Sequence, residues 1–299
     1  MSQPSTPTQP RTAAEMLQLA RGFLERKGVA EARLEAELLV AHTLGLDRLQ
    51  LFMQLDRPVL PAEVDRARDL FVRRGRREPL AYITGEREFY GRPFKVGPGV
   101  LIPRPETELV VDEARRVATE RGARELRVAD LGTGSGCLAV TLALELPEAQ
   151  VFALELSPAA ILCAQRNAEL LAARVEFVEG DGFASLARLV GAGGRFDLVV
   201  SNPPYVTREE RAGLAPEVVE HEPEMALFAP AGDADHFARR LLEHGYEWLV
   251  PGGALIVELG HQQGPRVLGL ARELGWQAAL VRDYAGIERV LVARLRDRS

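Results

Sequence analysis

The chain has 299 residues, 46% of them hydrophobic, with a net charge of −6 and a pI of about 5.6. This is enough for a large domain and a small one, each with its own core. The negative charge excludes a general positive field that would attract nucleic acid, and no apolar run is long enough to cross a bilayer. Because no signal-peptide pattern is present either, we expect a cytoplasmic protein without membrane contact.

Cysteine and histidine usage gives no sign of a disulfide framework or a metal site. Cys137 and Cys163 fall among apolar residues of expected helices, which favours structural burial. The five histidines lack the paired spacing of metal ligands. No metal is therefore expected.

The first part of the chain is expected to be a small all-helical domain over residues 12–77. Residues 1–11 are rich in Pro, Ser, Thr and Gln and should be a disordered tail. Thr12 and Glu15 have the spacing of a capping box. Apolar periodicity and end signals predict helices at about residues 12–27, 30–44, 49–52 and 61–71. The arginine-rich run at residues 73–77 favours a solvated helix end and linker over a contact site for an anionic partner.

Residues 78–104 are expected to form an ordered connector with a short hairpin around Gly91, and a helix should follow at about residues 107–121. Strands and helices then alternate. Strands are predicted at about residues 126–131, 150–155, 174–178, 196–200 and 253–259, with helices between them. Two closing strands, at about 277–283 and 288–295, should pair antiparallel. This order predicts an α/β fold over residues 105–299: a seven-stranded, mostly parallel sheet with helices on both faces.

A glycine-rich turn follows the first of these strands. Residues 128–136 read Val-Ala-Asp-Leu-Gly-Thr-Gly-Ser-Gly, and Glu155 ends the next strand, where a carboxylate can accept from both ribose hydroxyls. The turn alone suits S-adenosylmethionine, a nicotinamide or flavin dinucleotide, or a purely structural role, because it also satisfies the pattern G-x-G-x-x-A. Asp181 after the third strand and the closing strand pair favour S-adenosylmethionine.

Asn202-Pro203-Pro204-Tyr205 follows the strand predicted at 196–200. A planar NH2 group is a poor nucleophile because its nitrogen shares its lone pair with a π system. The Asn202 side-chain carbonyl and the Pro203 backbone carbonyl could accept both of its hydrogens, and two prolines keep that backbone stiff. Tyr205 offers a flat ring that could pack on the plane of the substrate group. The alternative is a rigid turn without chemistry.

With these motifs the chain resembles class I S-adenosylmethionine-dependent methyltransferases, and more specifically the HemK-type peptide chain release factor glutamine N5-methyltransferases. The resemblance also rests on Pro79-Leu80-Ala81-Tyr82-Ile83-Thr84-Gly85-Glu86, on Leu101-Ile102-Pro103-Arg104-Pro105-Glu106-Thr107-Glu108, and on Glu222-Pro223, Ala226-Leu227 and Gly232. It covers essentially the whole chain beyond the first ten residues.

The resemblance implies a fold, an activity and a set of roles. The cofactor would be S-adenosyl-L-methionine, and the substrate would be the glutamine of the Gly-Gly-Gln motif in class 1 release factors, gripped elsewhere by the helical domain. The cofactor would be bound by Gly132, Thr133, Gly134, Ser135, Gly136, Glu155, Asp181, Gly182 and Asn202. The glutamine would be bound by Asn202, Pro203, Pro204 and Tyr205, of which Asn202, Pro203 and Tyr205 would be catalytic.

The chain departs from the family pattern at two positions. Glu155 stands where Asp is frequent, and Gly182 stands where a bulky residue is frequent, with Phe183 next. Whether Phe183 covers the adenine or belongs to the core is open. Arg104 and Glu106 could order the connector or touch a ligand.

Three other functions are compatible with parts of the sequence. An amino-methylase of a nucleic-acid base (adenine N6 or guanine N2) shares the Asn-Pro-Pro-Tyr motif, but the acidic charge argues against it. A non-catalytic scaffold and a nicotinamide-dependent reductase are the others. We expect a monomer that does not bind nucleic acid directly.

Overall fold

The structure is a computed structural model that describes residues 10–122 and 125–295. It divides into two compact units. The helical unit comprises the described residues up to Gly85 together with Ala215–His221, and the sheet unit comprises Glu86–Leu214 together with the described residues from Glu222 onward. Residues 1–9 of the expected disordered tail lie outside the described part. None of the helices in the described ranges is long and apolar enough to cross a membrane.

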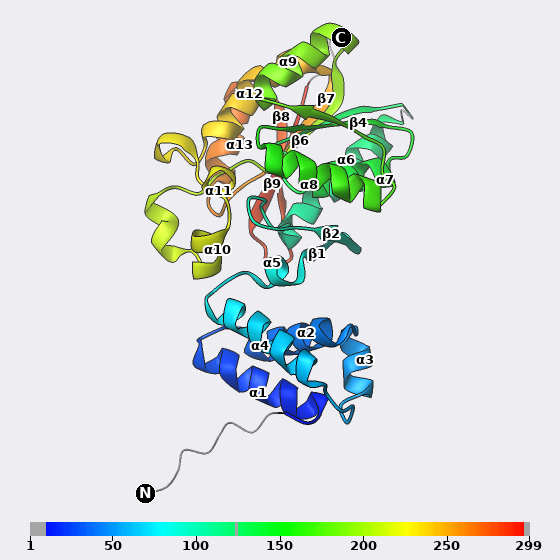
Figure 1. The fold of residues 1–299 in the computed structure, drawn as a ribbon. Helices are drawn as coiled ribbons and strands as arrows, with labels where there is room; N and C mark the ends of the chain where they lie inside the picture. The colour runs from blue at the N-terminus through cyan, green and yellow to red at the C-terminus, as the bar shows by residue number, and fades with distance from the viewer. Residues whose placement is uncertain (1–9, 123–124, 296–299) are drawn as a thin grey trace, which may run out of the picture. The chain divides into compact units, whose positions relative to one another are not determined.

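Four helices of the helical unit were expected from the sequence (Figure 1): α1 (Ala13–Arg26), α2 (Ala32–Leu44), α3 (Arg48–Met53) and α4 (Pro61–Gly75). The short helix α5 (Leu80–Thr84), which lies in the segment expected to be a connector, and α10 (Pro216–His221) were not expected, and both belong to this unit. Thr12 caps α1 by accepting from the Glu15 amide at 3.3 Å. The second half of the expected capping box is shifted by one residue, because the Glu15 carboxylate accepts from the amide of Arg11. Leu24, Leu39 and Leu51 form the centre of the core.

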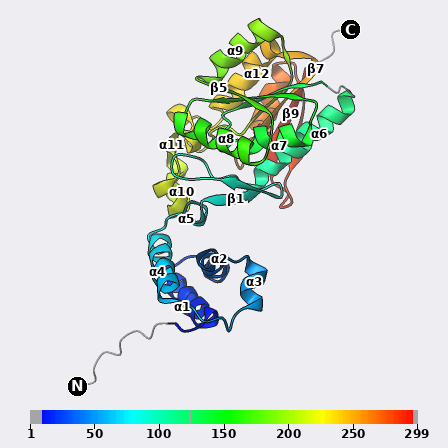
Figure 2. The ribbon, with the colours of Figure 1, turned by 45° about the vertical axis from the view of Figure 1, so that its right-hand side comes forward.

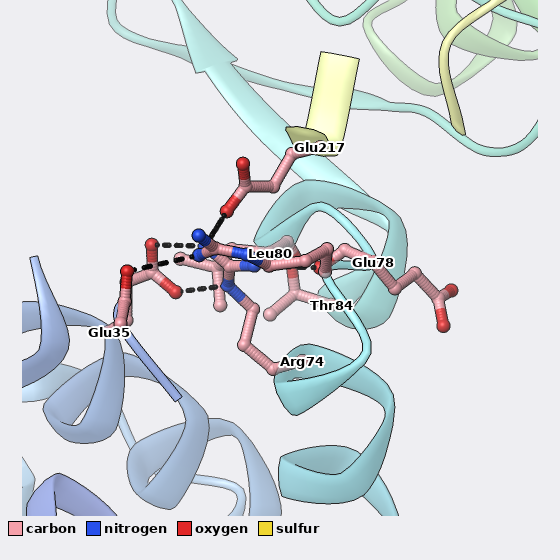
Figure 3. Close-up of polar contacts among 8 residues, drawn as sticks. Glu35, Arg74, Glu78, Leu80, Thr84 and Glu217 are labelled. Carbon is pink, nitrogen blue, oxygen red and sulfur yellow. Dashed lines mark hydrogen bonds and ion pairs between the residues drawn. The ribbon is translucent and has the colours of Figure 1, made fainter. Parts of the chain in front are cut away.

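The solvated helix end expected at residues 73–77 is wrong for Arg74. This side chain is buried at the end of α4, and its guanidinium binds the carboxylates of Glu35 and Glu217 (Figure 3). Arg77 also binds Glu217, at 3.1 Å, and Arg73 binds Glu78 at 2.5 Å. Carboxylates of the chain itself therefore neutralise much of this basic run.

The sheet unit has the expected seven-stranded sheet, in the order β5-β4-β3-β6-β7-β9-β8, so the predicted fold class is confirmed. The strands are β3 (Arg127–Leu131), β4 (Gln150–Glu155), β5 (Val175–Glu179), β6 (Phe196–Ser201), β7 (Leu249–Glu258), β8 (Gln277–Arg282) and β9 (Glu288–Arg294). The first five run parallel, while β9 pairs antiparallel with both β7 and β8. The predicted hairpin is β1 (Glu86–Phe89) with β2 (Arg92–Lys95).

Helices cover both faces of the sheet (Figures 1 and 2). On one face lie α6 (Glu108–Arg121), α7 (Cys137–Glu145) and α8 (Pro158–Leu170), and on the other lie α9 (Gly182–Gly193), α12 (His236–Trp248) and α13 (Gly264–Glu273). Successive residues of a strand point to opposite faces of the sheet. Val128 therefore belongs to the core on the side of α6, α7 and α8, and Ala129 to the core on the side of α9, α12 and α13. Burial on both faces explains why β3, β4 and β6 are nearly continuous apolar runs, whereas the edge strand β5 is only partly buried.

Short elements interrupt the two long connections. Before α6 lies η1 (Pro105–Thr107), and between β6 and α12 lie η2 (Glu209–Gly213), α10, α11 (Glu224–Leu227) and η3 (Pro230–Gly232). The sequence analysis missed these elements because each is too short to show a helical period.

Candidate active site

A cavity of about 200 Å³ opens at the carboxyl ends of β3, β4 and β6. This is the usual ligand position in open α/β sheets. Among the residues expected to bind a ligand, those that line it are Gly132, Thr133, Gly134, Ser135, Glu155, Asp181, Gly182, Asn202, Pro203 and Pro204. The structure thus brings these residues together, whereas Gly136 and Tyr205 are not part of the lining.

The glycine-rich turn leaves room for a ligand at two of its three glycines. Gly132, Gly134 and Gly136 have φ of 76°, 58° and 81°, which favours glycine. A Cβ at Gly132 or Gly134 would meet no atom within 4 Å, whereas one at Gly136 would lie 2.9 Å from the Cβ of Ala164. The first two glycines therefore open onto the cavity, and Gly136 allows α7 to pack closely on α8.

A buried carboxylate supports this turn from below. Asp130 accepts from the Thr133 hydroxyl at 2.6 Å and from the Ala139 amide at 3.2 Å through the same oxygen, Oδ2. Its other oxygen has no partner among the described residues. Burial raises the pKa of Asp130 to about 7. Asp130 was not predicted to have a role, although a carboxylate inside an apolar strand is a signal for one.

Glu155 connects the glycine-rich turn to the start of α8. Its Oε2 accepts from the Gly134 amide at 2.9 Å, and its Oε1 accepts from the Ser157 amide at 2.8 Å. Each carboxylate oxygen has a second lone pair, so the group can still accept from a ligand in the cavity. The extra methylene relative to Asp leaves that acceptor chemistry unchanged.

The structure explains why a small residue follows Asp181. A Cβ on Gly182 would lie 2.6 Å from Cδ1 of Leu131, so a bulky side chain would clash there. Asp181 caps α9 by accepting from the Ala184 amide at 2.9 Å. Phe183 lines the cavity and also packs edge-on against Trp248, with ring centroids 5.5 Å apart. It therefore belongs to both the cavity wall and the core.

Asn202 and Pro203 carry two carbonyl oxygens that accept no hydrogen bond from the described residues. The Asn202 amide nitrogen donates to Oγ1 of Thr107 at 3.1 Å. Within residues 10–122 and 125–295, no hydrogen bond reaches Asn202 Oδ1 or the Pro203 carbonyl. Beyond the motif, the Val206 amide donates to Leu227 and the Ala229 amide to Val206, at 3.1 and 2.8 Å, which fixes the loop.

Tyr205 lies beside the cavity rather than in its wall. Its ring packs so closely on Gly260 that a Cβ there would lie 2.7 Å from Cδ2 of the ring. Its hydroxyl donates to Oε1 of Glu258 at 3.3 Å. Burial raises the pKa of Tyr205, so the hydroxyl keeps its proton. The expected stacking of this ring on the substrate therefore stays a proposal.

Thr107 and Glu258, neither of which was predicted to have a role, complete the surroundings of the motif. Both are 2% exposed, and the Thr107 hydroxyl donates to Oε2 of Glu258 at 2.6 Å. Burial raises the pKa of Glu258 to about 7, to which the charge of Glu106 contributes. The only sequence signal for Glu258 was its place at the end of an apolar strand.

Arg104 orders the connector and also lines the cavity. Its guanidinium binds Oε1 of the buried Glu222 at 2.6 Å, while Oε2 of Glu222 accepts from the Ile102 amide at 3.1 Å. The structure therefore shows that Arg104 orders the connector, and contact with a ligand stays a prediction. In the described ranges, no cluster of three or more His, Cys, Asp or Glu residues could hold a metal ion.

The lining fits S-adenosylmethionine. The open space at Gly132 and Gly134 admits a ligand against the backbone, and Glu155 and Asp181 place one carboxylate at the end of each of the next two strands. Carboxylates there can accept from ribose hydroxyls and from an amino group. The unpaired carbonyls of Asn202 and Pro203 lie across the same cavity wall.

Comparison with known proteins identifies the family. Residues 15–85 match the family model described as PrmC N-terminal domain, and residues 110–226 match the one described as Methyltransferase small domain. A release factor glutamine methyltransferase of Geobacter sulfurreducens is 46% identical over 95% of this chain and 97% of that protein. Another, of Chlorobaculum tepidum, is 40% identical over 94% and 96%.

A solved structure shows the same fold at low identity. The hMettl16 catalytic domain, in complex with the MAT2A 3′UTR hairpin 6, aligns with a TM-score of 0.52 and 17% identity over 81% of this chain and 86% of that one. At this identity the likeness concerns the fold alone. The near full-length matches at 40–46% identity are decisive, and the chain belongs to the release factor glutamine methyltransferase family.

Proposed function

We propose that this chain transfers a methyl group from S-adenosyl-L-methionine to the side-chain nitrogen (N5) of the glutamine in the Gly-Gly-Gln motif of class 1 peptide chain release factors, and so supports translation termination. The observation that carries the proposal is the pair of unpaired carbonyl oxygens on Asn202 and Pro203 at the cavity wall. It belongs to a chain that matches a release factor glutamine methyltransferase over nearly its full length.

The chain's own residues would hold the cofactor at the strand ends. The backbone of Gly132 to Ser135 would lie against it, while Glu155 would accept from the ribose and Asp181 from the adenine amino group. Gly182 allows Leu131 to pack against the start of α9, and Phe183 would cover the cavity from the side of α9. When bound, S-adenosylmethionine supplies an electrophilic methyl group attached to a positively charged sulfur.

Asn202 and Pro203 would hold the substrate amide. A carboxamide NH2 has two hydrogens, and the two carbonyl oxygens can accept one each. This fixes the plane of the amide and the direction of its nitrogen lone pair, a positioning effect worth several kcal/mol. As the nitrogen becomes positive during methylation its hydrogens become more acidic, so both carbonyls bind the transition state more strongly than the ground state.

The proton balance requires no base before transfer. The nitrogen would gain the methyl group and the positive charge that the cofactor's sulfur gives up, and one of its two hydrogens would then leave as a proton to water. Pro204 stiffens the loop, and Tyr205 is proposed to support it and to face the substrate's plane. No side chain of the Asn-Pro-Pro-Tyr motif is a base at neutral pH.

A protein substrate is favoured over a nucleic acid. The basic run at residues 73–77 is the feature that would favour phosphate contacts, and Arg73, Arg74 and Arg77 bind carboxylates of the chain instead. We therefore extend the proposal to a monomeric cytoplasmic enzyme that acts on release factors without direct nucleic-acid contact.

Mass spectrometry of a class 1 release factor after incubation with the chain and S-adenosylmethionine tests the function. We expect one added methyl group on the Gly-Gly-Gln peptide, located on the glutamine side chain by fragmentation. A release factor whose glutamine is changed to alanine is the matched control and should stay unmodified. Methylation of DNA or RNA, with the release factor left unmodified, would contradict the proposal.

A further inference from the structure

Thr107 and Glu258 are buried side chains that take no part in the proposed methyl transfer. They link the two ends of the Asn-Pro-Pro-Tyr motif. Asn202 Nδ2 donates to Thr107 Oγ1 at 3.1 Å, and Thr107 Oγ1 donates to Glu258 Oε2 at 2.6 Å. The Tyr205 hydroxyl donates to Oε1 of the same carboxylate at 3.3 Å. Glu258 thus accepts from both ends of the motif, through Thr107 at one end and directly at the other.

The fold places these groups together for a simple reason. Neighbouring parallel strands β6 and β7 end at the same edge of the sheet, with Ser201 opposite Val257. The next residues, Asn202 and Glu258, therefore lie side by side at that edge. Thr107, at the end of η1, fills the space between them and is 2% exposed.

The order of donors and acceptors in this network has one consistent direction. A threonine hydroxyl has a single hydrogen, and above its pKa of about 7 the Glu258 carboxylate is ionised and can only accept. Because the hydrogen of Thr107 goes to Glu258, the Thr107 oxygen can offer only lone pairs to Asn202. The carboxamide of Asn202 must therefore turn its NH2 group, and not its carbonyl, towards Thr107.

This direction decides which atom of Asn202 faces the substrate. With Nδ2 held by Thr107, Oδ1 is left for the substrate's N–H, as the proposed clamp requires. In the flipped orientation Asn202 Oδ1 would face the lone pairs of Thr107, and the NH2 group of Asn202 would face the NH2 group of the substrate. The flipped side chain would then repel the amide that it is meant to hold.

We propose that Thr107 and Glu258 are positioning residues that set the orientation of the Asn202 carboxamide and hence make its carbonyl oxygen available to the substrate. The effect of this orientation on catalysis rests on the proposed function. The orientation of Asn202 itself can be measured in the chain without substrate. Glu258 also fixes Tyr205, so one carboxylate aligns the whole motif.

The chain offers a direct spectroscopic test. Asn167 and Asn202 are its two asparagines, so selective ¹⁵N labelling of asparagine side chains gives two NH2 signals. Asn167 is buried and donates to backbone carbonyls of Lys95 and Ser135 at 2.9 and 2.8 Å, away from the network, and serves as the internal reference. It also reports whether a variant keeps the fold of the sheet unit.

Thr107→Val removes the hydroxyl at nearly constant volume, and Thr107→Ser keeps it. We expect the Asn202 signals to move in Thr107→Val and in Glu258→Gln, whose amide can donate to Thr107 and release the threonine hydrogen towards Asn202. They should stay near their wild-type positions in Thr107→Ser, with Asn167 unchanged throughout. Asn202 signals that do not move in Thr107→Val and Glu258→Gln would overturn the proposal.

Kinetics supply the second readout. Thr107→Val should lower kcat by about 10- to 100-fold, as misalignment of a reacting group does, with KM for S-adenosylmethionine unchanged. Thr107→Ser should stay near wild type. Thr141→Val, which removes another fully buried hydroxyl in the same unit, is the matched control and should leave kcat unchanged. Equal loss in Thr107→Ser and Thr107→Val would count against positioning.

The two proposals can fail separately. If the wild-type chain leaves the Gly-Gly-Gln glutamine unmodified, the proposed function fails, and the asparagine spectra still decide whether Thr107 and Glu258 orient Asn202. If the wild-type chain methylates the glutamine and the spectra of the variants do not move, the function stands and the positioning role is wrong.

Discussion

At the scale of single residues, the site combines unpaired acceptors with buried carboxylates. Asn202 and Pro203 leave two oxygens free at the cavity wall, while Asp130 and Glu258 lie behind the lining, each with a pKa raised to about 7 by burial. Such carboxylates destabilise the folded chain when ionised. Their retention beside the cavity agrees with a role in ordering the groups that line it.

The raised pKa of Glu258 predicts a pH dependence of stability. Between about pH 4.5 and pH 7 the folded chain keeps a proton on Glu258 that the unfolded chain has lost, so the contribution of Glu258 to stability falls as the pH rises through this window. Glu258→Gln cannot titrate. Its free energy of unfolding relative to wild type should therefore rise by roughly 3 kcal/mol from pH 4.5 to pH 8.

Denaturant unfolding of both proteins across this pH range measures the difference. Asp130 titrates in both proteins, so its effect cancels in the comparison. A difference that is constant with pH would show that Glu258 has the same pKa in the folded and the unfolded chain, contrary to its buried environment.

At the scale of elements, the glycine-rich turn between β3 and α7 has two tasks that can be separated. Gly132→Ala puts a methyl group into the cavity, and Gly136→Ala puts one against Ala164 at 2.9 Å. Both pay about 1–2 kcal/mol for a positive φ. We expect Gly132→Ala to weaken S-adenosylmethionine binding most, and Gly136→Ala to lower stability most.

Calorimetric binding and thermal unfolding, measured together, check this separation. Gly286→Ala is the control, because it has φ of 80° in the β8–β9 turn with no atom within 4 Å of the added Cβ. It should show the strain alone and bind the cofactor normally. Identical losses of affinity in Gly132→Ala and Gly286→Ala would contradict the assignment of the cavity.

The elements most accurately predicted from sequence are the buried parallel strands and the turns at their ends. β3, β4 and β6 are apolar runs bounded by turn residues, and that pattern follows from burial on both faces. The start of β7 at Leu249 was missed, because Pro251 and two glycines look like a break. The register between β6 and β7 is irregular at this point, because Phe196 pairs with Leu249 whereas Leu198 pairs with Ala254.

Site residues were predictable where they lie in a recognisable pattern at the end of a strand. They were not predictable where the fold brings together segments that are far apart in the sequence. The glycine-rich turn, Glu155 and Asn202 each sit at a strand end, and strand ends meet at one edge of a parallel sheet. Thr107 and Glu258 are 151 residues apart in the chain, so only the fold shows that they form a hydrogen bond. Arg74 and Glu217 are likewise far apart in sequence.

At the scale of the whole molecule, the chain passes between the two units three times. It leaves the helical unit after Gly85, returns for Ala215–His221 and leaves again before Glu222. The segment that returns follows the Asn-Pro-Pro-Tyr loop by ten residues and is held by Arg74, whose side chain is 5% exposed. The helical unit is therefore completed by a segment of the loop that begins at the Asn-Pro-Pro-Tyr motif.

Removing this anchor should loosen the returning segment. Arg74→Met leaves the carboxylates of Glu35 and Glu217 without their shared cation, which we expect to cost about 2–4 kcal/mol. Hydrogen exchange over residues 215–221 should become faster. Arg73→Met, which removes the more exposed pair with Glu78, is the matched control and should cost less than about 1 kcal/mol. Equal protection of residues 215–221 in both variants would rule out the anchoring role.

The carbonyls of Asn202 and Pro203 are proposed to hold a glutamine amide for methylation, and Asn202→Ala tests this role most directly. Single-turnover transfer of labelled methyl to a release factor should fall by about 100-fold or more, as when a positioned transition-state contact is lost. The dissociation constant of S-adenosylmethionine should stay nearly unchanged. A variant that transfers methyl at the wild-type rate would show that the Asn202 carbonyl does not hold the amide, and would contradict the account.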